Sequence, residues 1–405
     1  MPDEVIHPPE VEPTPAPSQP PASRVDPAVT GKQLGIHQEL WDVVNTNYVD
    51  RDFNGHDWVA VGERYRAIVE DGLTDEDFYL AMELMIGELG DDHSRYDSPE
   101  QVRLDEEELA GQGDYVGIGT VVQYVSADVG AAILQVLPGG PAEAAGVRPH
   151  DVIAAIDGKP IIAAEMATAT RGPEGTDVTI TLERRGEGAR DLVLTRARVG
   201  SSPPVDHCLI LGTHIGYVLL PTLFDQTIPQ KLRDGLDTLS ADGPLEGLII
   251  DNRINGGGSS TVLYPIMSYF TNGTMGDFVS RERARPWVLD ADAVDGSQDV
   301  PLAVLVGPGT VSFGEIMTGT LQALDGAIVV GQTTGGNVET LSGYPLSDGS
   351  KAWIAHETFE PRTSTYGPWE DTGIIPDVEA PSRWDLFTSA DDPALAAAYE
   401  ALTQR

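Results

Sequence analysis

Apolar residues near the N-terminus recur every three or four positions, which is typical of helices packed on one face. The repeat runs through residues 36–50, 58–71 and 75–90, which read IHQELWDVVNTNYVD, WVAVGERYRAIVED and DEDFYLAMELMIGELG. We predict a helix over each segment. Asp75 is the expected cap of the third helix, and Gly90 is its expected end.

The pattern then changes to short apolar runs separated by turn residues, which is typical of β-strands. The runs are YVGIGTVVQYV, AAILQVL, DVIAAIDG and DVTITLERR, between residues 115 and 185. PGGPAEAAGV predicts a turn followed by a short helix, and RGPEGT predicts another turn. We expect this β-rich block to end near Arg198.

From about Ile215, buried strands alternate with amphipathic helices. The strands IGYVLLP, LEGLIID and LAVLVG are each followed by a helical pattern, and DPALAAAYEALTQR adds a surface helix at the C-terminus. This alternation predicts an α/β class protein with a mostly parallel sheet covered by helices.

Composition limits the choice of function. The chain has 405 residues, 40% of them hydrophobic, and a net charge of −39, which disfavours nucleic acid and anionic membranes as partners. Its apolar runs are too short for membrane insertion. The single cysteine, Cys208, excludes an internal disulfide and a cysteine zinc site, and its apolar neighbours predict inert packing.

Ser312 stands where a predicted strand, PLAVLVG, gives way to a predicted helix. A serine at this position is usually a helix cap, because its oxygen accepts from free N–H groups. The same position also suits a nucleophile, because helix N-terminal N–H groups stabilise an oxyanion. The local sequence leaves both interpretations open.

Longer stretches bring in a family resemblance. YVGIG (residues 115–119) and VLPGGPAEAAGVRPHDVIAAIDG resemble a PDZ domain, and YVGIG is similar to its peptide carboxylate-binding loop. Four further stretches resemble the tail-specific (C-terminal processing) serine peptidases and the related tricorn protease core. They are LGDDHSRY, IIDNRINGGG, TVSFGEIMTGTLQAL with AIVVGQTTGGN, and WEDTGIIPDVE. The resemblance implies a crotonase-like or Clp-protease-like α/β core with an N-terminal helical segment and an inserted PDZ domain.

The resemblance also implies roles for residues. Ser312 matches the nucleophile, three residues before Glu315, and the N–H groups of Phe313 and Gly258 match the oxyanion hole. The resemblance also implies that the PDZ loop binds peptide through Tyr115, Val116, Gly117, Ile118 and Gly119.

One position departs from the Ser–Lys type of this family. Asn337 stands where those enzymes carry the basic lysine, and an amide is no base at neutral pH. The tricorn-like type uses a His and a Glu instead, and His93 and Glu370 match these positions. We therefore expect His93 as general base and Glu370 as its orienting acceptor. Asp92, beside His93, is an alternative orienting residue.

These inferences predict five segments: a disordered proline-rich tail (1–30), a helical part (31–104), a PDZ domain (105–198), an α/β protease core (199–385) and a C-terminal helix (386–405). The predicted function is a serine endopeptidase acting on protein or peptide substrates through a Ser312 acyl-enzyme, with no cofactor and no metal. The resemblance implies an extracytoplasmic location, although no signal peptide is visible. Two alternatives are an inactive relative that binds peptide tails and a crotonase-like thioester enzyme.

Overall fold

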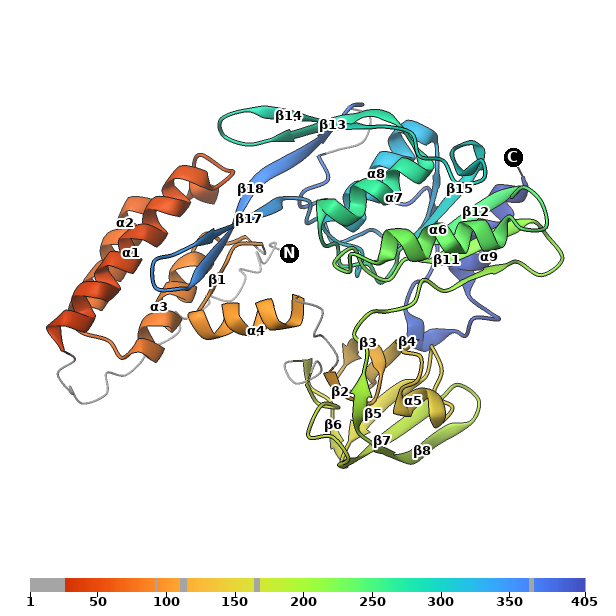
Figure 1. The fold of residues 1–405 in the computed structure, drawn as a ribbon, viewed down its shortest axis with the longest axis horizontal. Coiled ribbons are helices and arrows are strands. Elements are labelled where there is room, and N and C mark those ends of the chain that lie inside the picture. The colour runs from red at the N-terminus through yellow and green to blue at the C-terminus, as the bar shows by residue number, and fades with distance from the viewer. Residues whose placement is uncertain (1–25, 92, 110–114, 164–167, 364–367, 405) are drawn as a thin grey trace, which may run out of the picture.

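A computed structural model of the chain describes residues 26–91, 93–109, 115–163, 168–363 and 368–404. Three parts can be followed in Figure 1: a helical lobe, an α/β core and a smaller β-rich domain below the core. This architecture confirms the predicted α/β fold with an N-terminal helical segment and an inserted β-rich domain.

The helical lobe is built on apolar stripes that meet in one cluster. Its elements are α1 (Pro27–Asn47), α2 (Trp58–Glu70), α3 (Asp75–Gly87), β1 (Arg95–Asp97) and α4 (Pro99–Leu109). Leu40, Val44 and Met82 are fully buried in this cluster. Burial of such side chains stabilises a helix bundle by roughly 1.5–3 kcal/mol each.

Several predicted boundaries were wrong in this lobe. Helix α1 begins at Pro27, inside the predicted tail 1–30, because the Asp26 carboxylate caps it and Pro27 suits the first helical position. Thr74, and not Asp75, caps α3, which ends at Gly87, before Gly90. Helix α4 runs across the predicted boundary at 104/105, so we propose that the PDZ domain begins after α4. The rest of the predicted tail lies outside the described residues.

The β-rich domain contains two sheets. The larger has the strand order β3-β4-β5-β7-β8, with β6 paired to β5, and the smaller joins β2 to β9. Its elements are β2 (Tyr115–Gly117), β3 (Thr120–Ser126), β4 (Gly130–Val136), α5 (Pro141–Ala144), β5 (Val152–Ile156), β6 (Lys159–Pro160), β7 (Asp177–Arg184), β8 (Gly188–Thr195) and β9 (Ala197–Val199).

The core holds a six-stranded sheet of order β10-β11-β12-β15-β16-β19, in which every pair except β10–β11 is parallel. Its elements are β10 (His207–Leu209), β11 (Ile215–Leu219), α6 (Ile228–Leu239), β12 (Gly247–Asp251), α7 (Ser260–Phe270), β15 (Leu302–Val306), α8 (Phe313–Asp325), β16 (Ile328–Gly331), β19 (Val378–Glu379) and α9 (Pro393–Thr403). Cys208 is exposed on the antiparallel edge strand β10, so the predicted inert packing was wrong.

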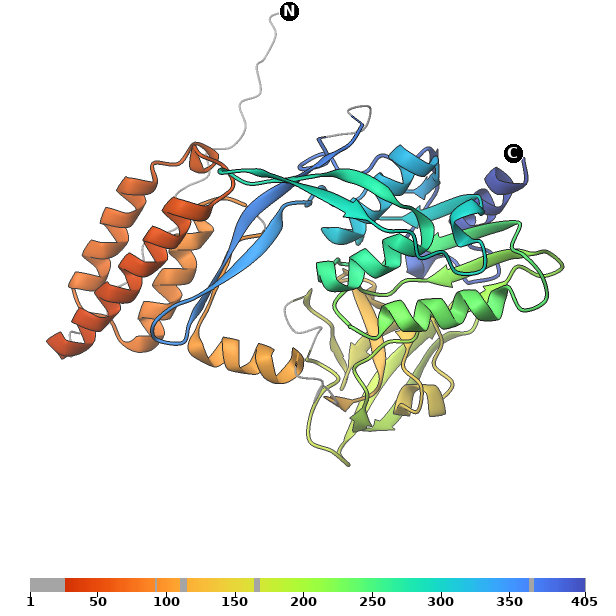
Figure 2. The ribbon, with the colours of Figure 1, turned by 45° about the horizontal axis from the view of Figure 1, so that its top comes forward.

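Long strands connect the helical lobe to the core, as Figure 2 shows. They are β13 (Gly273–Val279), β14 (Ala284–Leu289), β17 (Thr340–Pro345) and β18 (Lys351–Pro361). Strand β18 pairs with β1 in the lobe through its first residues and with β13 beside the core through its last ones. The same sheet therefore positions the segment before β1 relative to the core.

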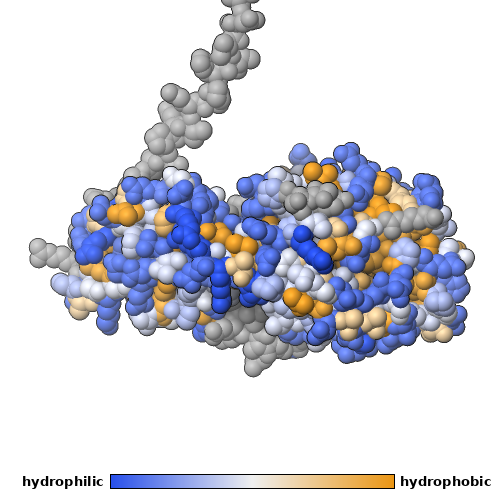
Figure 3. Space-filling view, turned by 90° about the horizontal axis from the view of Figure 1, so that it is seen from above, coloured by the Kyte–Doolittle hydropathy of each residue, from blue (hydrophilic) through white to orange (hydrophobic). Residues whose placement is uncertain are grey.

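The surface is largely hydrophilic on the face seen from above (Figure 3). Figure 3 shows hydrophilic residues over much of the face seen from above, with apolar residues in smaller groups among them. Within the described ranges, no helix is both long enough and apolar enough to cross a membrane.

Candidate active site

Ser312 lies at the turn between β15 and α8 and has an unusual backbone conformation. Its φ is 56° and its ψ is −129°, a region that residues with a side chain rarely adopt. Its N–H donates to the Asn337 carbonyl (2.7 Å) and to Oε2 of Glu315 (3.1 Å). Strain held by such contacts is common where a nucleophile must be presented at a strand-to-helix turn.

The NGGG loop after β12 packs closely against this serine. A Cβ atom added to Gly257 would lie 3.0 Å from Ser312 Oγ and 3.2 Å from the Phe313 nitrogen. Gly258 has a φ of 151° and fits against the backbone of Leu223, where a side chain would collide with the Leu223 carbonyl carbon. Glycine is required here because the two backbone segments approach too closely to leave room for a Cβ atom.

The two N–H groups expected to form an oxyanion hole are available. In the part of the chain that the structure describes, the N–H groups of Gly258 and Phe313 donate to no acceptor. The neighbouring Gly257 N–H is already used by Asn255 Oδ1, at 3.0 Å. Free N–H groups beside the Ser312 hydroxyl are what a developing oxyanion requires.

The Glu315 carboxylate anchors the turn at Ser312 through hydrogen bonds. The side chain is fully buried. Oε1 accepts from Gly336 N (2.7 Å) and from the Thr334 hydroxyl, and Oε2 accepts from Asn337 N (2.9 Å) as well as from Ser312 N. The carboxylate at the third position of α8 therefore joins the serine turn to the 334–337 loop and lies in the favourable field of the helix N-terminus.

His93 and Glu370 are brought together although they are 277 residues apart. His93 Nε2 lies 3.1 Å from Glu370 Oε1. Oε2 of Glu370 accepts from Val338 N (2.8 Å) and Glu339 N (3.0 Å). The His93 segment is itself fixed by Asp91, whose Oδ1 accepts from the His93 N–H at 2.9 Å.

The imidazole is buried and surrounded by acids. Burial lowers the pKa of His93, but the hydrogen bond and charge of Glu370, followed by the charges of Glu339 and Asp91, outweigh it, so the pKa is raised overall. No hydrogen bond joins His93 to Ser312 among the described residues, and the alternative orienting residue Asp92 lies outside them. Hydrogen bonds of this kind often form only when substrate is bound.

Asn337 connects the two halves of the site. Its carbonyl binds the Ser312 N–H, and the next amide along the chain, Val338 N, binds Glu370. The serine backbone and the acid that holds His93 are thus anchored on consecutive residues. Asn337, which the sequence resemblance matched to the lysine of the Ser–Lys enzymes, contacts Ser312 through its backbone.

Glu339 is a site residue that the sequence analysis missed. Burial, followed by the charge of Glu370, raises its pKa to about 7, against a smaller lowering by His93. A pKa shift of this size marks candidate functional groups. The only sequence signal was a carboxylate two residues after Asn337, and nothing in that spacing pointed to His93.

The PDZ loop has a different geometry from the one expected. Tyr115–Gly117 form strand β2, paired with β9, so only Ile118 and Gly119 form the loop itself. Burial raises the pKa of Tyr115, while hydrogen bonding to the amides of Thr120 and Gly119 and the nearby Arg171 guanidinium oppose the rise. The phenol oxygen therefore faces the backbone N–H groups of Thr120 and Gly119.

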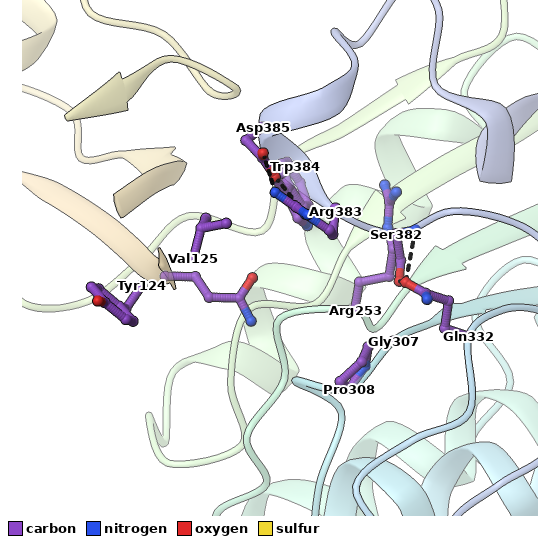
Figure 4. A pocket seen from close by; sticks show the side chains of 11 residues that line it. Tyr124, Val125, Arg253, Gly307, Pro308, Gln332, Ser382, Arg383, Trp384 and Asp385 are labelled. Atoms are coloured by element: carbon purple, nitrogen blue, oxygen red, sulfur yellow. Dashed lines mark hydrogen bonds and ion pairs between the residues drawn. The ribbon is translucent and has the colours of Figure 1, made fainter. Parts of the chain in front are cut away.

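A cavity of about 200 Å³ lies at the seam between the β-rich domain and the core, away from these residues. Figure 4 shows Val125 and Tyr124 on one side of it and Gln332, Ser382 and Pro308 on the other. None of Ser312, His93 and Glu370 lines it.

Comparisons with known proteins agree with this architecture. Residues 214–380 match the model of peptidase family S41, residues 34–87 the tricorn protease C1 domain, and residues 133–184 a PDZ domain. The chain is 31% identical to carboxyl-terminal-processing peptidase 2, chloroplastic, of Arabidopsis thaliana, over 85% of this chain and 68% of that protein. The chain belongs to peptidase family S41.

Two further relatives support the assignment. The carboxyl-terminal-processing protease of Synechocystis is 31% identical, with 90% of this chain and 86% of that protein covered. The solved structure of a photosystem II D1 C-terminal processing protease shares 27% identity and gives a TM-score of 0.61, over 86% of this chain and 93% of that one. This S41 protein is a serine peptidase with a PDZ domain.

The buried carboxylate of Glu315 yields a first prediction. Replacing it in Glu315→Gln puts an N–H₂ group in front of backbone N–H donors, which leaves buried groups unpaired. We expect a loss of about 2–4 kcal/mol in the free energy of unfolding. Urea denaturation followed by circular dichroism measures this loss.

The matched control is Glu246→Gln, an exposed glutamate before β12, which should change stability by less than about 0.5 kcal/mol. Equal denaturation midpoints for the Glu315→Gln and Glu246→Gln proteins would show that the hydrogen bonds of Glu315 do not stabilise the fold.

Proposed function

We propose that Ser312 is the nucleophile of this S41 peptidase, with His93 as general base and Glu370 as the residue that orients it. The observation that carries the proposal is the His93–Glu370 contact, anchored by Val338 next to the residue whose carbonyl holds Ser312. A base must replace the missing lysine, since the Asn337 amide cannot accept a proton at neutral pH.

The contact also supports a role for each imidazole nitrogen. With Nε2–H donating to Glu370, Nδ1 carries the lone pair that takes the proton of the Ser312 hydroxyl. The serine oxygen then attacks the peptide carbonyl, and the oxyanion is held by the N–H groups of Gly258 and Phe313. His93 returns the proton to the leaving amine, and water attacks the acyl-enzyme by the same route.

For substrates, we propose proteins with accessible C-termini. Relatives of this chain are named for carboxyl-terminal processing. The edge strand β3 of the PDZ domain suits pairing with an extended peptide, and the segment 115–119 suits capture of its carboxylate. The domain would thus hold substrate tails or gate their access to Ser312.

For location, we propose an extracytoplasmic compartment. The support is the proline-rich composition of residues 7–23, HPPEVEPTPAPSQPPAS, which suits an extended tether between an anchor and a folded domain. Antibody detection after fractionation of the source cells tests this location.

Casein digestion tests the proposed site. The Ser312→Ala and His93→Ala proteins should lose more than about 1,000-fold in peptide release, because the nucleophile or its base is gone. Asn337→Ala should remain active, since its backbone contact with Ser312 is kept. A His93→Ala protein as active as the unsubstituted enzyme would exclude His93 as the base.

The pH dependence gives a further prediction. His93 must be neutral to act as base, so kcat/KM should fall as the pH drops through its raised pKa. In Glu370→Gln the stabilising charge is removed while burial, which lowers the pKa, remains. The fall of kcat/KM at acid pH, measured on the activity that Glu370→Gln retains, should therefore occur at lower pH than in the unsubstituted enzyme. Glu379→Gln, an exposed control on β19, should not shift this fall; a fall that Glu370→Gln leaves at the same pH contradicts the pairing.

Tyr115 offers a test of the PDZ loop. In Tyr115→Phe the phenol oxygen no longer competes for the amides of Thr120 and Gly119. A fluorescent peptide with an apolar free C-terminus should bind severalfold more tightly to Ser312→Ala/Tyr115→Phe than to Ser312→Ala. Fluorescence anisotropy measures both affinities. Equal binding of the same peptide with an amidated C-terminus would show that the loop does not recognise a carboxylate.

A further inference from the structure

Three potential metal ligands converge next to the proposed base. One ligand atom each from His93, Glu339 and Glu370 lies within 4.8 Å of the others. They come from three distant segments: the loop before β1, the residue before β17 and the loop that follows Trp369. His93 is buried, and the two glutamates are half-buried.

The cluster carries uncompensated negative charge. Asp91 and Asp371 add their fields to those of the two glutamates. Within the described ranges, no lysine or arginine forms an ion pair with any of these four acids, and the only ion pair among them is His93–Glu370. The Glu339 side chain also has no hydrogen-bond partner there, so its oxygens are available to a cation.

We propose that His93, Glu339 and Glu370 form an inhibitory binding site for a divalent cation with the preferences of Zn²⁺. One imidazole nitrogen and two carboxylate oxygens are ligands that Zn²⁺ accepts, and three protein ligands leave a fourth position for water. Mg²⁺ and Ca²⁺ favour sites built mainly of oxygen ligands and waters. The binding site stands on the geometry alone, whereas the inhibition rests on the proposed role of His93.

The inhibition follows from the two imidazole nitrogens. Because the Glu370 carboxylate accepts, the neutral ring of the free enzyme carries its proton on Nε2 and its lone pair on Nδ1. Zn²⁺ bound at Nε2 needs the lone pair of that nitrogen, so the proton of the neutral ring moves to Nδ1. His93 then presents N–H instead of a lone pair to Ser312, with no net gain or loss of protons on the ring. The serine can no longer be deprotonated.

The binding test uses ZnCl₂ and the full chain carrying Cys208→Ser and Ser312→Ala, which removes the exposed thiol and prevents self-digestion. Isothermal titration calorimetry should find one Zn²⁺ site. Adding Glu339→Gln should weaken it by at least about tenfold, because a direct ligand is lost. Adding Glu246→Gln instead should not change it. Equal affinities in the two variants, or no binding to the parent, would overturn the site.

The inhibition test uses casein cleavage by the Cys208→Ser enzyme. Zn²⁺ should abolish cleavage and EDTA should restore it, and Glu339→Gln should raise the inhibitory concentration by the same factor as the binding constant. Cleavage unaffected by saturating Zn²⁺ would overturn the inhibition. An enzyme that binds Zn²⁺ as expected but never cleaves casein would instead contradict the proposed function and leave the binding site standing.

Discussion

The buried carboxylate of Glu315 is the constraint on which the candidate site depends. A charged group without water is costly unless its oxygens are fully hydrogen-bonded, and here three backbone N–H groups and one hydroxyl supply the partners. The Thr334 hydroxyl also accepts from Ile374 N, so a second loop joins the network. The strained backbone of Ser312 is therefore held by contacts that cannot be lost singly without leaving a buried charge unsatisfied.

Strand β18 provides the second constraint, at longer range. It pairs with β1 directly after the His93 segment, and Ala355 N donates to the Ser94 hydroxyl. Strand β17, which begins one residue after Glu339, pairs with the same strand. His93 and Glu339 thus lie next to strands of one sheet, and Ser312 follows a strand of the other. Glu370 is held by the N–H groups of Val338 and Glu339, just before β17. The loop 334–339 connects the two systems.

Much of the fold could be predicted because buried strands and helices show a local pattern of apolar residues in the sequence. Strands β11, β12 and β15 are continuous apolar runs, as a parallel sheet covered on both faces requires. Segment ends were harder. The cap of α3 depends on which of two adjacent polar residues reaches a free N–H group, and Thr74 was the one that did.

Candidate site residues could be predicted only where they lie within a recognisable sequence motif. Ser312, His93 and Glu370 became candidates through their sequence neighbours, and the structure places His93 against Glu370. Glu339 and the orientation of Tyr115 could not be found in this way. Each depends on a contact across distant segments or on a side-chain direction, and neither leaves a periodic signal in the sequence. Asp92 stays a prediction from the sequence.

The division of the site between two sheets has a consequence for the life of the newly made chain. Ser312 lies in the core and His93 in the helical lobe, and β18, which pairs with both sides, is synthesised after both. In the described part of the chain, the sheet that pairs the lobe with the core is complete only once β18, which ends at Pro361, has been made, so the proposed base and nucleophile come together late in synthesis.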